Sequence, residues 1–202
     1  MALREKRECA SMIAGHFGFA ALVKGRELNT PLWILMFASV WLDLVFVPLF
    51  FTGIETIQPV RGHQGYGSSV IHADYTHSFV GMLVLSAILA TICLPFWGKR
   101  SATVIGLVAA SHWVLDLVVH RADMPILPGN IAHLPRLGFG LWRFPWASVA
   151  IEAVLVLLGA GLYWIAARSV SIQAKQKPRM AAAVALLIAT CGIFILYLDV
   201  ST

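Results

Sequence analysis

The sequence predicts an all-α protein, a polytopic membrane helical bundle, and three observations lead to this fold class. Hydrophobic residues make up 59% of the 202 residues, charged residues make up 12%, and the mean hydropathy is +0.79. Soluble domains carry about 25% charged residues, so the composition excludes an ordinary soluble protein. Apolar runs of about 20 residues, enough to span a bilayer as a helix, recur along the chain. At this length we expect residues 1–202 to form a single integral membrane domain.

Five segments are long and apolar enough to cross a membrane as helices. These transmembrane spans are 31–52, 76–97, 101–120, 146–167 and 180–199. An earlier stretch, 8–24, is apolar but shorter, and we expect a short buried or interfacial helix there. It begins like a signal peptide, but it contains His16 and has no convincing small-residue cleavage site. The loop 121–145 is rich in Pro and Gly, which predicts a re-entrant or interfacial lid.

Basic residues predict the orientation of the bundle, because they gather in three of the short segments that flank the spans. These residues are Lys24 and Arg26, then Lys99 and Arg100, then Arg168, Lys175, Lys177 and Arg179. The predicted spans place all three groups on one side, which the positive-inside rule assigns to the cytoplasm. We therefore expect a multi-pass protein of the bacterial inner (plasma) membrane.

The same patterns exclude several other classes of protein. The net charge of +5 lies in these short segments between spans, so it does not indicate nucleic-acid binding. The three cysteines, Cys9, Cys93 and Cys191, are scattered and form no CxxC pair. This argues against a disulfide framework and against a thiolate zinc site.

Ionisable side chains inside the apolar runs are the strongest functional signal in this sequence. An ionisable group in the hydrocarbon region costs at least roughly 2.5–3.5 kcal/mol, so it faces the bundle interior by default and marks function. The predicted topology brings such groups from four helices to one depth, in the outer part of the membrane. These residues are Asp43, His77, His112, Asp116 and Glu152.

Two short motifs carry much of this chemistry. His112 and Asp116 are four residues apart and share a helix face, which suits two ligands of one metal or a ligand and its orienting partner. A His–Asp hydrogen bond that only staples the bundle is the alternative reading. His72, Asp74 and His77 fall within six positions, and Thr76 can cap the helix that follows. We expect Asp74 or His72 to act as general base or acid.

The predicted site offers only carboxylates and imidazoles, because no Lys or Arg lies within a span. Neutral imidazoles with carboxylates suit a divalent metal, for which we expect zinc, with manganese or iron as alternatives. Such an ion lowers the pKa of a bound water to about 7. At the end of the span 101–120 and in the loop that follows it, His120, Arg121 and Arg136 are expected to bind a phosphate head group, with interfacial anchoring as the alternative for each arginine.

The order and spacing of these motifs resemble the YdjM-like group of bacterial inner-membrane proteins, known as membrane-bound metal-dependent hydrolases. The resemblance covers about residues 15–145. The matching residues are Gly15-His16, Asp43, His72 through His77-Ser78, and Ser111-His112 through Asp116.

That family is thought to be distantly similar to zinc-dependent phospholipase C and P1-type nucleases, which are all-helical and bind metal through His and Asp. The resemblance implies that the metal ligands here are His16, Asp43, His77, His112 and Asp116. The family motif Pro-Asp-x-Asp reads Leu42-Asp43-Leu44-Val45 in this chain, and its His-Arg-Gly reads His72-Ala73-Asp74. Because the second carboxylate of the first motif is missing, we expect a single metal ion.

Together these inferences predict a metal-dependent hydrolase whose substrate is a phosphate ester of a lipid or lipid-linked molecule, reached from the outer leaflet. Two other classes remain open. Intramembrane His and Asp also build ion or proton pathways, which favours a transporter, although we find no internal repeat and few spans. Two histidines on different helices, His77 and His112, can also ligate a haem iron in a redox subunit.

Overall fold

The computed structural model describes residues 12–59, 69–174 and 179–201, and helices dominate it. The structure is 75% helical, with six α-helices in the part of the chain that it describes, which confirms the predicted helical bundle. Their bounds are α1 Ile13–Arg26, α2 Leu32–Ser39, α3 Trp41–Phe51, α4 Phe79–Val119, α5 Pro145–Gln173 and α6 Arg179–Ser201. Residues 8–11 of the first predicted helix lie outside the described residues.

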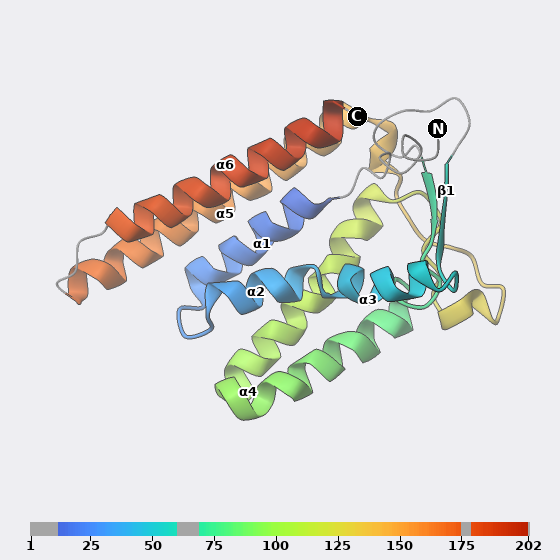
Figure 1. Cartoon of the computed structure of the whole chain (residues 1–202), viewed down its shortest axis with the longest axis horizontal. Helices are drawn as coiled ribbons and strands as arrows, with labels where there is room; N and C mark the ends of the chain where they lie inside the picture. Colours follow the sequence, from blue (N-terminus) through green and yellow to red (C-terminus); the bar gives the residue numbers. More distant parts are fainter. Residues whose placement is uncertain (1–11, 60–68, 175–178, 202) are drawn as a thin grey trace.

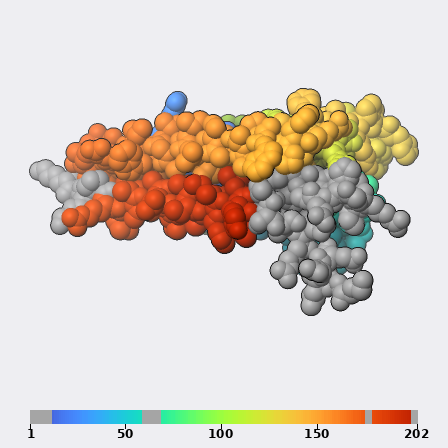
Figure 2. Space-filling model, turned by 90° about the horizontal axis from the view of Figure 1, so that it is seen from above, coloured from blue at the N-terminus to red at the C-terminus, as the bar shows by residue number. Residues whose placement is uncertain are grey.

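Three of these helices are long and apolar enough to cross a membrane, namely α4, α5 and α6. A fourth crossing is added if the bent pair of α2 and α3 counts as one span. Figure 2 shows α5 and α6 side by side along the length of the molecule. The predicted count of five spans is therefore not confirmed, although a membrane protein is consistent with these helices.

Helix α4 is two helical arms that meet at Gly98, where Figure 1 shows a sharp corner. Gly98 has a φ of 73°, a left-handed conformation that glycine adopts without steric cost. A Cβ atom at Gly106 would lie 2.9 Å from the Cβ of Ala90, so the arms pack against each other beside this corner. The reversal falls between the predicted spans 76–97 and 101–120.

The predicted span 31–52 is broken near its middle, which corrects the expectation of one continuous helix. α2 and α3 meet at Val40, whose φ of −117° is not helical, and their axes bend by 47°. In an unbroken helix the Ser39 carbonyl would accept a hydrogen bond from the Asp43 amide. The break frees that carbonyl and places Asp43 in the first turn of α3, where the helix dipole favours a negative charge.

A short β-hairpin corrects the all-α prediction for the loop after α3. Strands β1 (Thr56–Pro59) and β2 (Ser69–His72) pair in antiparallel register, with Thr56 opposite His72. Thr56, Ile57, Val70 and Ile71 are β-branched, a residue type that favours strands. The segment is too short for its β-branched residues to stand out from an irregular polar loop in the sequence.

Helix α1 packs in parallel against α5 through glycines. A Cβ atom at Gly18 would lie 2.6 Å from the backbone of Leu155, and one at Gly25 would lie 2.8 Å from that of Leu162. Gly159 of α5 in turn lies directly against the Gly18 backbone. Glycine lets the two helix backbones approach this closely, so α1 is held deep in the bundle with His16 buried.

The described residues of the three predicted basic groups lie at one end of the bundle, and Lys175 and Lys177 lie outside the described residues. Arg100, at the corner of α4, binds the Glu27 carboxylate with an Nη2–Oε2 distance of 2.8 Å. The Lys24 ammonium donates hydrogen bonds to two backbone carbonyls just after α1. Lys24 also lines a cavity with Ala167 and Met180, which flank the connection from α5 to α6. The β-hairpin lies at the opposite end (Figure 1).

Candidate metal centre

The five residues predicted as metal ligands converge on one point of the structure. Three of them form a compact triangle of ligand atoms. The Nε2 atoms of His77 and His112 are 3.2 Å apart, and Asp43 Oδ1 lies 3.4 Å from the first and 3.5 Å from the second. The three residues come from α3, from the segment before α4 and from the second arm of α4.

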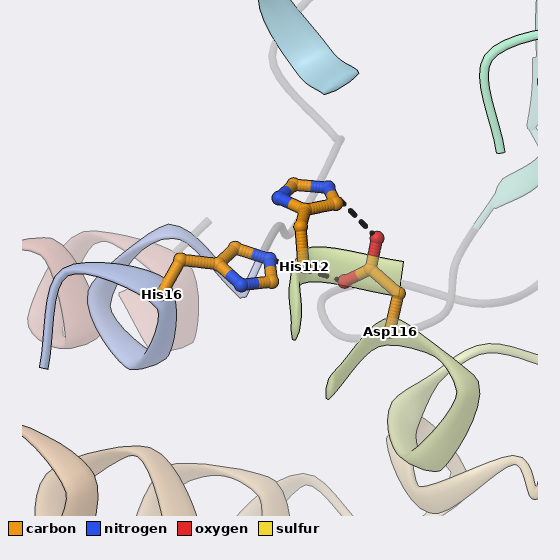
Figure 3. A group of neighbouring side chains, drawn as sticks. All are labelled: His16, His112 and Asp116. Atoms are coloured by element: carbon orange, nitrogen blue, oxygen red, sulfur yellow. Dashed lines mark hydrogen bonds and ion pairs between the residues drawn. The ribbon is translucent and has the colours of Figure 1, made fainter. Parts of the chain in front are cut away.

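Asp116 forms a second triangle on the same pair of imidazoles. Its Oδ2 atom lies 3.5 Å from His77 Nε2 and 3.1 Å from His112 Nε2. The other oxygen, Oδ1, lies 3.1 Å from Nε2 of His16 on α1. Figure 3 shows the Asp116 carboxylate beside His16 and His112, with one oxygen directed at each imidazole. The rings of these two histidines stack at a centroid distance of 3.9 Å. Among the described residues, two groups of three could hold a metal ion, namely Asp43 with His77 and His112, and His16 with His112 and Asp116, so His112 belongs to both.

These distances match those expected around a bound ion. Nitrogen and oxygen ligands about 2.0–2.1 Å from a tetrahedral zinc ion lie roughly 3.3–3.4 Å from one another. Both triangles have edges of 3.1–3.5 Å. An ion at either face therefore needs only small shifts of the side chains.

The outward-facing nitrogens of three imidazoles are anchored by hydrogen bonds. His112 Nδ1 lies 2.7 Å from the Ser39 carbonyl that the break between α2 and α3 leaves free. His77 Nδ1 lies 2.9 Å from the Thr76 hydroxyl. His120 Nδ1 lies 3.0 Å from Asp123 Oδ1. In metal sites such bonds orient the ring and leave Nε2 free to bind the ion.

The donor chemistry of the cluster fits a cation. The Ser39 carbonyl accepts a hydrogen from Nδ1 of His112, so Nε2 of a neutral His112 ring carries a lone pair. That lone pair faces carboxylate oxygens of Asp43 and Asp116, which also only accept. Acceptors this close repel one another unless a proton or a metal ion lies between them. The residues present therefore fit a divalent ion.

A cavity of about 250 Å³ opens onto the cluster. The walls are mostly apolar, and the polar residues His16, Asp43, His77, Asp116 and His120 line it together with Met12, Ile13, Phe46, Val47, Ile57, Ile71 and Trp142. The Asp43 side chain is 38% exposed, whereas that of Asp116 is 6% exposed. Asp43 is therefore the carboxylate that faces the open space.

His120 lines the cavity, as expected of a substrate-binding residue, but it also lies beside Asp116 of the His and Asp cluster. Its Nε2 atom lies 3.9 Å from Asp116 Oδ2. The Trp142 ring covers it at a centroid distance of 4.4 Å. Burial alone lowers the pKa of His120, but the hydrogen bond with Asp123 and the charge of Asp116 outweigh burial and raise the pKa.

The other predicted site residues lie apart from this cavity. Arg136 forms a bidentate ion pair with Asp74, at 2.6 and 3.0 Å, and these bonds raise the pKa of the guanidinium. His72 is a half-buried residue of β2, and Arg121 is half-buried at the start of the lid. None of the four lines the cavity. Their predicted roles in catalysis and substrate binding stay predictions, and for Asp74 and Arg136 the structure provides a different partner.

The lid, residues 121–144, covers the start of α4. Its re-entrant or interfacial placement in a membrane stays a prediction. The lid contains the short 3₁₀ turns η2 (Pro128–Asn130) and η3 (Leu141–Arg143). Carbonyls of Pro125 and Ile126 accept the first free amides of α4, from Phe79 and Val80. Ser78, rather than the predicted Thr76, caps this helix by accepting a hydrogen bond from the Gly81 amide at 2.9 Å.

Glu55 and Asp123 were not predicted as site residues, and Glu152 was expected at the depth of the site without an assigned role. Glu55 is fully buried and binds Thr76, and Asp123 holds His120. Glu152, also fully buried, accepts a hydrogen bond from the Gly15 amide at 3.2 Å and so fixes the start of α1 beside His16. Only Glu152 carried a signal, because it lies within an apolar run.

Comparison with known proteins gives no relative from which a function can be transferred. No protein-family model, curated protein or solved structure matches this chain.

Proposed function

We propose that this protein is an integral membrane metal-dependent hydrolase that cleaves a phosphate ester of a lipid or lipid-linked substrate. The observation that carries this proposal is the double triangle of imidazole and carboxylate atoms at the base of an apolar cavity. The resemblance of the motifs to the YdjM-like hydrolases agrees with it. The proposal extends to five membrane crossings, with each arm of α4 counted as one.

The residues that would hold the ion are His77, His112, Asp43 and Asp116, joined by His16 through the second oxygen of Asp116. We take the ion to be zinc, because tetrahedral sites of imidazole and carboxylate suit it. A bound divalent ion supplies Lewis acidity and lowers the pKa of a bound water to about 7. The two carboxylates balance the charge of one divalent ion.

His120 and Asp123 are placed to handle a proton beside this centre. The carboxylate of Asp123 accepts the Nδ1 hydrogen, so the Nε2 atom of His120 is directed toward Asp116 and the cavity. A general base or acid must lie within hydrogen-bond reach of the reacting group. His120 satisfies this requirement better than Asp74 or His72, which do not line the cavity.

The cavity walls support an amphiphilic substrate. Met12, Phe46 and Ile71 offer apolar contact to a lipid chain. Trp142 is 3% exposed, and among the described residues its Nε1 atom has no hydrogen-bond partner. A buried donor without a partner costs about 1–3 kcal/mol, and an oxygen of a bound ligand would remove that cost. We place this face toward the outer leaflet of a bacterial inner membrane, with the basic end in the cytoplasm.

The decisive experiment is elemental analysis of the detergent-purified protein, wild type beside Asp116→Ala. The proposal expects close to one zinc per chain in the wild type and none in the variant. Phospholipids and lipid diphosphates are then screened for zinc-dependent release of phosphate or head group. Failure of the wild-type protein to bind zinc, manganese or iron after reconstitution would sink the hydrolase and favour a proton or ion pathway.

A further inference from the structure

Glu55 is a fully buried carboxylate that belongs neither to the His and Asp cluster nor to the lining of the cavity. It lies between α3 and β1, and its exposed fraction is 0%. A buried charge is costly unless hydrogen bonds compensate it. The hydrogen-bond partners of the Glu55 carboxylate therefore indicate the role of this buried charge.

Among the described residues, the hydrogen-bond partners of the Glu55 carboxylate belong to the two residues that precede His77. Its Oε1 atom accepts the backbone amides of Tyr75 at 2.8 Å and Thr76 at 2.9 Å. The Thr76 hydroxyl lies 3.1 Å from Oε1 and 2.9 Å from Oε2. An ionised carboxylate only accepts hydrogen bonds, so the single hydroxyl hydrogen of Thr76 points at Glu55.

This direction determines which nitrogen of His77 carries the proton. The Thr76 oxygen also lies 2.9 Å from His77 Nδ1, and its only hydrogen is already donated to Glu55. The oxygen must therefore accept in this second contact, so the proton of a neutral imidazole is on Nδ1. Nε2 is left with a lone pair directed at His112 and Asp43.

We propose that Glu55 is a positioning residue that fixes the tautomer and the direction of His77 through the Thr76 hydroxyl, so that Nε2 is available to a metal ion. The inference rests on the proposed metal function of the cluster. The Trp113 indole also fixes His77, because its Nε1–H donates a hydrogen bond to the His77 carbonyl at 2.8 Å.

Thr76 and Glu55 can be tested by substitution, whereas the matching anchor of His112 is a backbone carbonyl. Thr76→Val keeps the size of the side chain and removes the hydroxyl, and Thr76→Ser restores the hydroxyl. Glu55→Gln replaces one carboxylate oxygen with an amide donor. Residue 55 then no longer forces the hydroxyl hydrogen of Thr76 to point toward it. Glu27→Gln is the matched control, because Glu27 is a buried glutamate paired with Arg100 at the other end.

Two measurements are made on each variant. Zinc affinity is measured by competition with a chromophoric chelator. The proton position on His77 is read from the imidazole ¹⁵N shifts of the metal-free protein at alkaline pH, where the rings are neutral. Loss of such an orienting bond typically weakens metal binding about 10–100-fold. We expect that loss for Thr76→Val and Glu55→Gln, with Nε2–H appearing on His77, recovery in Thr76→Ser and no change in Glu27→Gln.

The proposal is overturned if Thr76→Val binds zinc like the wild type and keeps the proton on Nδ1. His77→Ala separates this failure from a failure of the metal site. If His77→Ala also binds zinc like the wild type, His77 is not a ligand and the proposed function is at fault. If Glu55→Gln does not fold, the Thr76 pair decides the result, because Val and Ser change only the hydroxyl and one methyl group.

Discussion

Buried carboxylates have different kinds of partner at the two ends of the bundle. At the basic end, the Glu27 carboxylate pairs with the Arg100 guanidinium at an Nη2–Oε2 distance of 2.8 Å. At the other end, only histidines pair with Asp43 and Asp116 among the described residues. Hydrogen bonds to the Nδ1 atoms of His77 and His112 orient both rings. The Nε2 atoms of the two rings therefore face the carboxylate oxygens of the aspartates.

The difference distinguishes a charge that stabilises the fold from a charge that is left for a ligand. An arginine beside Glu27 completes its hydrogen bonds within the chain. In the proposed function, a cation from outside completes the cluster of His77, His112 and the two aspartates. Substitutions at both ends test this distinction.

The largest effect is expected for His112→Ala, because His112 belongs to both ligand groups. Loss of an orienting partner costs about 10–100-fold in metal affinity, so loss of a ligand should cost at least about 100-fold. Zinc content of the purified variant and a chelator titration measure this loss. Stoichiometric zinc retained at wild-type affinity would remove His112 from the site.

Asp43→Asn is expected to have opposite effects on metal binding and on stability. An amide nitrogen in place of Oδ1 would donate to the imidazoles of His77 and His112, 3.4 and 3.5 Å away. We expect zinc affinity to fall about 10-fold or more, while the metal-free protein gains about 1 kcal/mol. Thermal unfolding in chelator, beside the wild type, checks the gain. A lower midpoint in chelator would show that the acceptors do not repel one another.

Arg136→Met is expected to loosen the lid and leave the metal in place. The ion pair with Asp74 is bidentate and about three-quarters buried, so its loss should cost about 1–3 kcal/mol. Asp74→Asn should act in the same direction. Unfolding midpoint, proteolysis of the lid and zinc content are measured together. Unchanged stability with weakened binding of a phospholipid would return Arg136 to its predicted role in substrate binding.

Arg100→Gln is expected to have the smallest effect. The arginine side chain is 74% exposed, so solvent screens its ion pair with Glu27 and the cost should be below about 1 kcal/mol. Zinc affinity should not change, because this pair lies at the opposite end from the cluster. A change in zinc affinity would show that the two ends are coupled.

The sequence alone predicted a helical membrane fold and the approach of Asp43, His77, His112 and Asp116 to one another. Hydrocarbon makes an isolated Asp43 or His112 costly, so the helices had to bring these groups together. His16, in the short first helix, also joined the cluster, as the resemblance to the family implied. The spacing of His112 and Asp116 likewise placed both on one face of the second arm of α4.

Other features could not be predicted, because they depend on contacts between distant segments. No Pro or Gly marks the helix break at Val40 in the sequence. The break has a role only in the folded chain, where the freed Ser39 carbonyl binds His112. Glu55 lies in a polar loop and gains its meaning from Thr76, 21 residues later. The pair of Arg136 and Asp74 spans 62 residues, so each looked free to act in catalysis or binding.

The parallel packing of α1 on α5 has a consequence for the biogenesis of the protein. Fourteen residues of helix are about 21 Å long, which is less than the roughly 30 Å core of a bilayer. The contact of Gly15 with Glu152 joins residues 137 positions apart. The first helix is synthesised early, but its packing partner α5 is synthesised more than a hundred residues later. The contact of His16 with Asp116 therefore gains the support of α5 only late in synthesis.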